Sequence, residues 1–316
     1  MWDTVWFKYE FAKQSMPVED LFFSLCDSVA PAPYKGQGAY ECYHKNMLIL
    51  YVDRGQNNGY IMFQGSLSKY MYGNNIQTIT TTDTHRAIEQ LQDTFGLLFM
   101  DCPLQRLDVS NVINTLKEPT EYYPYLEGLS IGKDVYHKNV NTHSIYFDFS
   151  TPSRYRRMQI QFYDKVEEAK RHNIPVPTEL EGLNLLRYEV RYLTPTTNFK
   201  RQILLSELTD IHFLELCFND WKSIYNHITK KTSLFMPNYN EIKTYKDLQA
   251  LAETVGYMVL GEAVIHKADW NNYQNKSRAL DKYRDRISSK KNLYEDPIIK
   301  EITDKINGFE LIELMS

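Results

Sequence analysis

The chain has 316 residues, 43% of them hydrophobic and 24% charged, a composition typical of globular proteins with one large or two modest domains. It contains no apolar run near the ~18–20 residues of a membrane span, no signal-peptide pattern at its start and no CxxC pair among its four cysteines. These features argue against membrane proteins, secreted mini-domains and zinc fingers, and they fit a reducing cytosol. With a formal net charge of −4, the protein would need a local basic patch to bind nucleic acid.

The first half of the chain is predicted to consist mainly of β-strands, because aromatic and β-branched residues are concentrated there. Residues 47–64 are expected to form a hairpin around a Gly- and Asn-containing turn at 54–59. A helix is predicted at 84–95, where apolar residues recur at helical spacing, with Asp83 or Thr84 as its cap. The other elements expected here are strands at 2–11 and 104–109 and a short helix at 18–28.

A second hairpin is predicted from two strand-like segments at 144–149 and 156–163, which are joined by turn-forming residues. A short helix at 165–172 and a strand at 185–193 should follow. Beyond Pro195 the spacing becomes helical, in the segments 206–229, 245–264, 269–288 and 296–306. The predicted fold class is α+β: an antiparallel sheet flanked by helices in residues 1–203, followed by a helical C-terminal region in residues 204–316.

Three of these strands place polar side chains on one face, because alternate residues of a strand point to opposite sides. If the three strands are neighbours, the shared polar face collects Asp108, Glu189 and Tyr163. The charged residues around them would be Arg106, Arg187, Arg191, Lys165, Glu167 and Glu168.

This collection suits phosphodiester chemistry. Two or three carboxylates bind a hard cation such as Mg²⁺ or Mn²⁺, which can polarise a phosphate. A tyrosine hydroxyl can attack that phosphate and form a phosphotyrosine link, while lysine and arginine side chains hold phosphate oxygens. The alternative is an antiparallel sheet with one solvated face, on which Arg–Glu pairs form between strands. The alternation of residue types alone leaves both interpretations open.

Four blocks of sequence resemble the replication initiators of the filamentous-phage gene II/X family, which also occur on bacterial plasmids. In the family's order, the blocks are Gln64-Gly-Ser-Leu-Ser-Lys-Tyr70 with Gly73-Asn-Asn75, Cys102-Pro-Leu-Gln-Arg-Leu-Asp108, Gln159-Ile-Gln-Phe-Tyr-Asp-Lys-Val-Glu-Glu168 and Leu186-Arg-Tyr-Glu-Val-Arg191. The chain is more distantly similar to the Rep_trans type of rolling-circle initiator. The resemblance implies a rolling-circle nuclease-like fold and site-specific nicking and joining of origin DNA.

Carried over by position, the resemblance makes Tyr163 the nicking nucleophile and Lys165 the neighbour that activates it. Asp108 and Glu189 become ligands of Mg²⁺ or Mn²⁺. Glu168 is the third candidate ligand, and Glu167 is the alternative to it. The sequence lacks the His-hydrophobic-His triplet of related nucleases, as expected of the branches that use carboxylates.

Other tyrosines remain candidate nucleophiles. Tyr146 lies in the second predicted hairpin, and Tyr155 lies beside its arginine-rich turn. Tyr188 should point to the apolar face of its strand, which favours a place in the core.

Basic residues are concentrated near the predicted site. Residues 151–201 carry ten Lys or Arg against six acids, and residues 276–291 carry seven against two. The second stretch is either a duplex-binding segment or a solvated helix face. The predicted DNA contacts are Arg106, Arg154, Arg156, Arg157, Arg187, Arg191 and Lys69. No Gly-x-x-x-x-Gly-Lys-(Ser/Thr) motif occurs, which argues against an ATP-driven helicase.

The implied partners are single-stranded or hairpin origin DNA and the helicase and polymerase of a bacterial host, in whose cytoplasm the protein would act without a membrane. The C-terminal helices have three open roles, which are binding DNA, recruiting helicase and joining two copies as a homodimer. The rival functions are a conjugative relaxase-like nickase, a non-catalytic origin-binding protein with the same fold, and a structural sheet protein.

Overall fold

The computed structural model describes residues 1–12, 22, 29–32, 39–55, 58–132, 134–149, 158–230, 242–256 and 296–311. The chain forms two compact units, one of residues 1–229 with 305–316 and the other of residues 230–304. The first unit therefore continues past residue 203, the expected end of the catalytic domain. The division into a catalytic domain and a helical C-terminal region stays a prediction. Within the described ranges, no helix is both long enough and apolar enough to cross a membrane.

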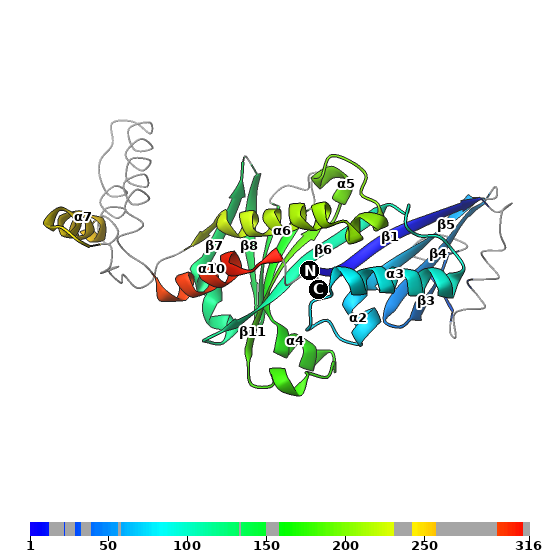
Figure 1. The fold of residues 1–316 in the computed structure, drawn as a ribbon, viewed down its shortest axis with the longest axis horizontal. Coiled ribbons are helices and arrows are strands. Elements are labelled where there is room, and N and C mark those ends of the chain that lie inside the picture. Colours follow the sequence, from blue (N-terminus) through cyan, green and yellow to red (C-terminus); the bar gives the residue numbers. More distant parts are fainter. Residues whose placement is uncertain are drawn as a thin grey trace. The chain divides into compact units, whose positions relative to one another are not determined.

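The first unit is built on one large sheet with the strand order β12-β7-β8-β9-β10-β11-β6-β1-β5-β4-β3-β2 (Figure 1). The strands are β1 (Trp2–Ala12), β2 (Ala30–Pro31), β3 (Ala39–His44), β4 (Met47–Gly55), β5 (Asn58–Ser66), β6 (Leu104–Thr115), β7 (Leu126–Ile131), β8 (Asp134–Asn141), β9 (Ser144–Phe149), β10 (Met158–Asp164), β11 (Asn184–Tyr192) and β12 (Ile228–Lys230). The pairings β9–β10, β10–β11, β11–β6, β6–β1 and β1–β5 are all antiparallel. This confirms the α+β class with its antiparallel sheet, whereas the rolling-circle nuclease-like assignment stays a prediction.

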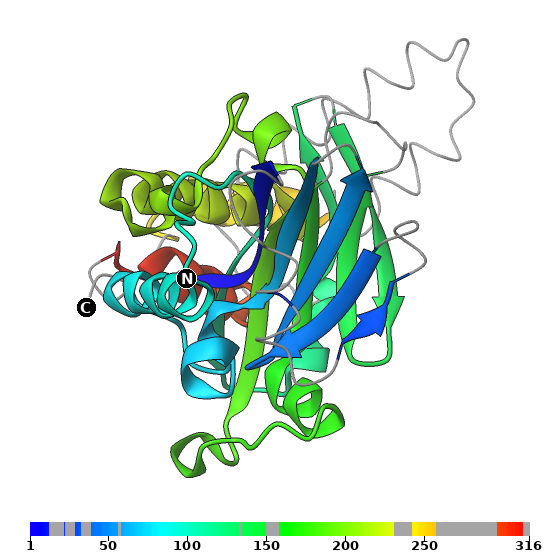
Figure 2. The same cartoon turned by 90° about the vertical axis from the view of Figure 1, so that its right-hand side faces the viewer.

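The helical elements are α2 (Leu67–Tyr72), α3 (Thr81–Phe95), η2 (Pro119–Tyr125), α4 (Lys165–Arg171), η3 (Thr178–Leu180), α5 (Pro195–Asn198), η4 (Leu205–Thr209), α6 (Ile211–Asn226), α7 (Tyr245–Gly256) and α10 (Pro297–Gly308). Figure 2 shows α3 and α6 lying together against one face of the sheet. Of the expected C-terminal helices, the segment 269–288 lies outside the described residues, as does most of the helix expected at 18–28.

The face of the sheet under α6 is apolar. The Tyr188 ring of β11 lies 4.7 Å from the Trp221 ring of α6, and its hydroxyl donates to the Trp221 carbonyl at 3.0 Å. Both side chains are buried. Tyr188 is therefore a core residue, as its position in the strand predicted.

Helix α3 begins earlier than predicted. The backbone of Thr80 is extended, and its side-chain oxygen accepts a hydrogen bond from the Asp83 backbone nitrogen at 3.1 Å. Such a bond satisfies one of the free N–H groups at the start of a helix. Thr80 is therefore the cap, and the prediction of Asp83 or Thr84 was wrong, because the helical apolar spacing does not mark the first turn.

The cysteines also depart in part from the expected reduced state. Cys102 and Cys217 are free and buried, and burial raises the pKa of the Cys102 thiol to about 12. Cys42 on β3 is disulfide-bonded.

Candidate active site

Strands β10, β11 and β6 lie side by side, as the proposed polar face required. Gln161 of β10 is opposite Glu189 of β11, and Arg191 of β11 is opposite Asp108 of β6. Residues that are directly opposite in neighbouring strands share a face of the sheet. The register therefore brings Asp108, Glu189 and Tyr163 to one face, away from α6.

Glu189 lies at the centre of this group. The Tyr163 hydroxyl donates to Glu189 Oε2 at 3.0 Å, and Arg191 Nε lies 2.5 Å from Glu189 Oε1. The same Arg191 nitrogen is 3.9 Å from Asp108 Oδ2, so one guanidinium lies between the two carboxylates. Tyr163 is only 6% exposed, and burial raises its pKa well above its usual range.

Asp108 is fully buried and is held by a second arginine. Arg106 donates from Nε and Nη2 to the two oxygens of Asp108, at 2.8 and 2.5 Å. Burial, and after it the charge of Glu189, raise the pKa of Asp108 to about 7 against the opposing effect of the arginines. Asp108 and Glu189 therefore form a carboxylate pair whose negative charges are close enough to interact.

A second polar cluster is centred on Asp3 of β1, a residue that the sequence did not single out. Arg187 Nη2 lies 2.9 Å from Asp3 Oδ2, while Ser66 and Asn75 donate to Asp3 Oδ1 at 2.9 and 3.1 Å. Lys165 Nζ donates to Asn75 Oδ1 at 2.7 Å. Arg187, whose Nε is 3.7 Å from Glu189 Oε2, connects this cluster to the carboxylate pair.

Glu168 lies apart from the carboxylate pair. Its Oε2 accepts a hydrogen bond from Lys165 Nζ at 2.6 Å, and Glu167 is paired with Lys170 at 2.8 Å. Within the part of the chain that the structure describes, no three His, Cys, Asp or Glu side chains are grouped to hold a metal ion. The structure thus brings together two of the three expected ligands, because the first turn of α4 directs both glutamates to lysines.

The burial of Lys165 predicts a pH-dependent stability. Burial, and then the charge of Arg187, lower its pKa from 10.5 to about 8. Between pH 8 and 10.5 the unfolded chain holds a proton that the folded chain has lost, so this group makes the free energy of unfolding rise with pH. Urea unfolding should show this rise, at most about 3 kcal/mol, in the wild type but not in Lys165→Met. Parallel pH profiles for the two proteins would contradict the prediction.

The charged centre of the site does not lie on a solvated surface, as the alternative interpretation would require. Asp108, Glu189, Lys165 and Arg187 are all buried. The network joins four acidic side chains to four basic ones. The acidic residues are Asp3, Asp108, Glu168 and Glu189, and the basic residues are Arg106, Arg187, Arg191 and Lys165. Buried charges are tolerated when they are paired and hydrogen-bonded in this way.

All four sequence blocks converge on this network, and a comparison with protein families gives the same result. Residues 29–209 match the family of the N-terminal region of the gene II replication-associated protein, over more than half of the chain. The protein belongs to this family. It is a replication initiator of the filamentous-phage gene II type, as the blocks predicted. A comparison with curated proteins found no match.

The predicted DNA-binding residues of this initiator differ in how far they reach solvent. The side chains of Arg106 and Arg191 are 18% and 25% exposed, whereas that of Arg187 is only 5% exposed. Arg187 Nη2 and Nη1 donate to the Ser110 hydroxyl and the Asn75 carbonyl, each at 2.5 Å, which indicates a structural role. Lys69 is half-buried on α2. The predicted contacts Arg154, Arg156 and Arg157, together with Tyr155, lie outside the described residues.

Sequence reasoning missed Asp3, gave no role to Asn75, and considered Ser66 only as a place where the backbone could approach a phosphate or turn at the end of a strand. Asn75 and Ser66 belong to the first block of the family resemblance, so their presence there was a usable signal. Asp3 lies in an aromatic strand and outside the matched residues 29–209. Its role depends on the pairing of β1 with β6, and no local pattern marks that pairing.

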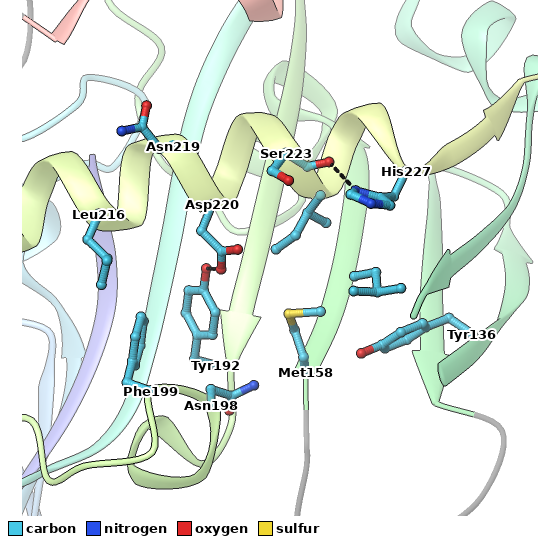
Figure 3. A pocket seen from close by; sticks show the side chains of 12 residues that line it. Tyr136, Met158, Tyr192, Asn198, Phe199, Leu216, Asn219, Asp220, Ser223 and His227 are labelled. Carbon is cyan, nitrogen blue, oxygen red and sulfur yellow. Dashed lines mark hydrogen bonds between the residues drawn. The ribbon is translucent and has the colours of Figure 1, made fainter. Parts of the chain in front are cut away.

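A separate cavity lies on the opposite face of the sheet, between α6 and the strands (Figure 3). Its volume is about 470 Å³, and its lining includes Met158, Phe199 and Tyr136. The Tyr192 hydroxyl donates to Asp220 Oδ2 there at 2.5 Å. Because Tyr192 and Met158 are paired across β11 and β10 on the α6 side, this cavity is distinct from the carboxylate pair.

Proposed function

We propose that this replication initiator nicks and rejoins one strand of its origin DNA through a covalent link between a 5′ phosphate and Tyr163. One observation carries the proposal: the Tyr163 hydroxyl donates to Glu189 at 3.0 Å beside the carboxylate of Asp108. One face of the sheet therefore carries a nucleophilic hydroxyl, the Glu189 carboxylate as the acceptor for its proton, and the Asp108 carboxylate as a second ligand for a metal ion.

Asp108 and Glu189 fit Mg²⁺ or Mn²⁺. Mg²⁺ is commonly bound through one or two protein carboxylates together with phosphate oxygens of the substrate, so a third protein carboxylate is not required. When bound, the ion would polarise the scissile phosphate and stabilise the charge that develops on it. Arg106 and Arg191, which hold the two carboxylates, also have the fork geometry that suits phosphate oxygens.

The proposed reaction conserves the number of phosphodiester bonds. The Tyr163 oxygen attacks phosphorus while its proton passes to Glu189 Oε2. The bond from phosphorus to the 3′ oxygen breaks, and that oxygen takes up a proton from solvent and leaves as a 3′ hydroxyl. Later attack by a 3′ hydroxyl, which loses its proton to solvent, breaks the phosphotyrosine bond and restores the DNA strand, while Tyr163 regains its proton from Glu189.

Tyr146 is the second candidate nucleophile. It lies opposite Gln161 of β10, the strand between Tyr146 and Glu189, on the same face of the sheet, and it is half-buried where Tyr163 is buried. A phosphate could therefore approach Tyr146 with less rearrangement. The contact with Glu189 favours Tyr163, because an acceptor for the proton is already in place.

The test is incubation of the protein with labelled single-stranded origin DNA and Mn²⁺, followed by a denaturing gel. A protein-linked DNA band supports the proposal. Binding of the origin without any adduct would instead favour the non-catalytic origin-binding alternative.

The expected setting is the cytoplasm of a bacterial host, where the host helicase and polymerase would extend the free 3′ end.

The same assay gives a prediction for Asp108. We expect Asp108→Asn to lower the rate of adduct formation at least about a hundredfold, because a lost ligand removes several kcal/mol of metal-ion stabilisation. Excess Mn²⁺ should recover part of this rate. Asp148→Asn, which changes a half-buried carboxylate of the same face on β9, is the matched control and should leave the rate within a few-fold. Equal rates for wild type and Asp108→Asn would rule out a ligand role for Asp108.

A further inference from the structure

Trp6 of β1 lies on the polar face, in a row of half-buried side chains beside the carboxylate pair. It is opposite Arg106 of β6 on one side and Gln64 of β5 on the other. All three side chains are half-buried. The other tryptophans in the described residues, Trp2 and Trp221, are buried. The exposure of Trp6 on this face is therefore not explained by packing in the core.

Arg106 connects Trp6 to the proposed site. Its guanidinium carbon lies 5.1 Å from the centre of the Trp6 ring, within the range of a cation–π contact. The same guanidinium donates two hydrogen bonds to Asp108. Indole, guanidinium and carboxylate thus form a continuous chain of contacts across two neighbouring strands.

We propose that Trp6 and Arg106 form a stacking platform for one base of single-stranded DNA, next to the phosphate that a metal ion at Asp108 and Glu189 would hold. The inference rests on the proposed function, because the position of the reacting phosphate is taken from that proposal. The backbone positions of Trp6 and Asp108 are diagonal neighbours on adjacent strands, roughly 7–8 Å apart. That spacing is comparable to the distance between successive phosphates of an extended DNA strand.

The residue types determine what this platform recognises. Bases stack on aromatic rings and on guanidinium planes, and every base offers a π face, so the platform would bind any base. It would orient the strand on the sheet rather than read its sequence. A duplex would not suit it, because paired bases are already stacked on one another. Its expected occupant is therefore an unpaired nucleotide flanking the nicking position.

The experiment compares full-length wild type, Trp6→Leu and Trp6→Phe for binding to a labelled single-stranded oligothymidine and to the same strand with abasic sites. Leucine keeps apolar volume without a π face, whereas phenylalanine keeps a ring. We expect Trp6→Leu to weaken oligothymidine binding about 5- to 100-fold, and Trp6→Phe to restore most of it. On the abasic strand the three proteins should bind alike. Oligothymidine should also quench the tryptophan fluorescence of the wild type, a measurement that needs no variant.

The outcomes separate this inference from the proposed function. Unchanged oligothymidine binding by a folded Trp6→Leu protein, or equal losses on oligothymidine and the abasic strand, would overturn the stacking platform even if wild type nicks origin DNA. Base-dependent binding through Trp6 in a protein that forms no adduct would support the platform while the nicking proposal fails. If Trp6→Leu does not fold, absence of fluorescence quenching in wild type at saturating oligothymidine overturns the inference.

Discussion

Tyr163→Phe should reduce the formation of the protein–DNA adduct to below detection, a loss of roughly a million-fold in rate. Removing a covalent nucleophile has effects of this size, because the residual rate comes only from binding and electrostatics. Phenylalanine keeps the ring and loses only the hydroxyl that donates to Glu189. The adduct is measured on a denaturing gel with labelled origin strand and Mn²⁺, and folding is checked by thermal unfolding.

Tyr192→Phe is the matched control for this experiment. Tyr192 is also buried and also donates to a carboxylate, that of Asp220, but it lies on the opposite face of the sheet. It should lose about 1 kcal/mol of unfolding free energy and keep its nicking rate. An adduct that survives Tyr163→Phe but disappears in Tyr146→Phe would assign the reaction to Tyr146 and leave Tyr163 a positioning residue for Glu189.

Arg187→Met should be among the most destabilising single changes in the protein. The side chain of Arg187 is buried, and it pairs with Asp3 and donates to the Asn75 carbonyl and the Ser110 hydroxyl. Removing it leaves Asp3 as a buried charge without its main partner, which costs about 3–5 kcal/mol. A typical domain has only about 5–15 kcal/mol of unfolding free energy, so urea unfolding should show a large loss.

Arg86→Met provides the comparison. Arg86 is also paired with an aspartate, Asp83, at 3.0 Å, but its side chain is 63% exposed, so its loss should cost less than about 1 kcal/mol. Arg187→Met combined with Asp3→Leu should be less destabilised than Arg187→Met alone, because the unpaired charge is gone. A loss below about 1 kcal/mol for Arg187→Met would show that the Asp3 cluster contributes little to stability.

The sequence by itself predicted the β4–β5 and β9–β10 hairpins and the shared face of Asp108, Glu189 and Tyr163. The physical reason is local, because successive side chains of a strand point to opposite faces of the sheet. The face of a side chain therefore follows from its position in the strand alone. The residue pattern alone did not show that the three strands are neighbours, so this was an assumption. The family blocks supported it, and the pairing of β10 with β11 and of β11 with β6 confirmed it.

Only the tertiary structure decided the partners of these charges. Glu168 contacts Lys165 instead of the carboxylate pair, and Arg187 is buried against Asp3 instead of facing DNA. Glu168 and Lys165 lie three residues apart on α4, but Lys165 also donates to the distant Asn75, and Asp3 and Arg187 are separated by most of the sheet unit's sequence. Alternation along a strand places a side chain on a face, but burial and pairing across strands determine whether its charge meets a metal ion, DNA or another side chain.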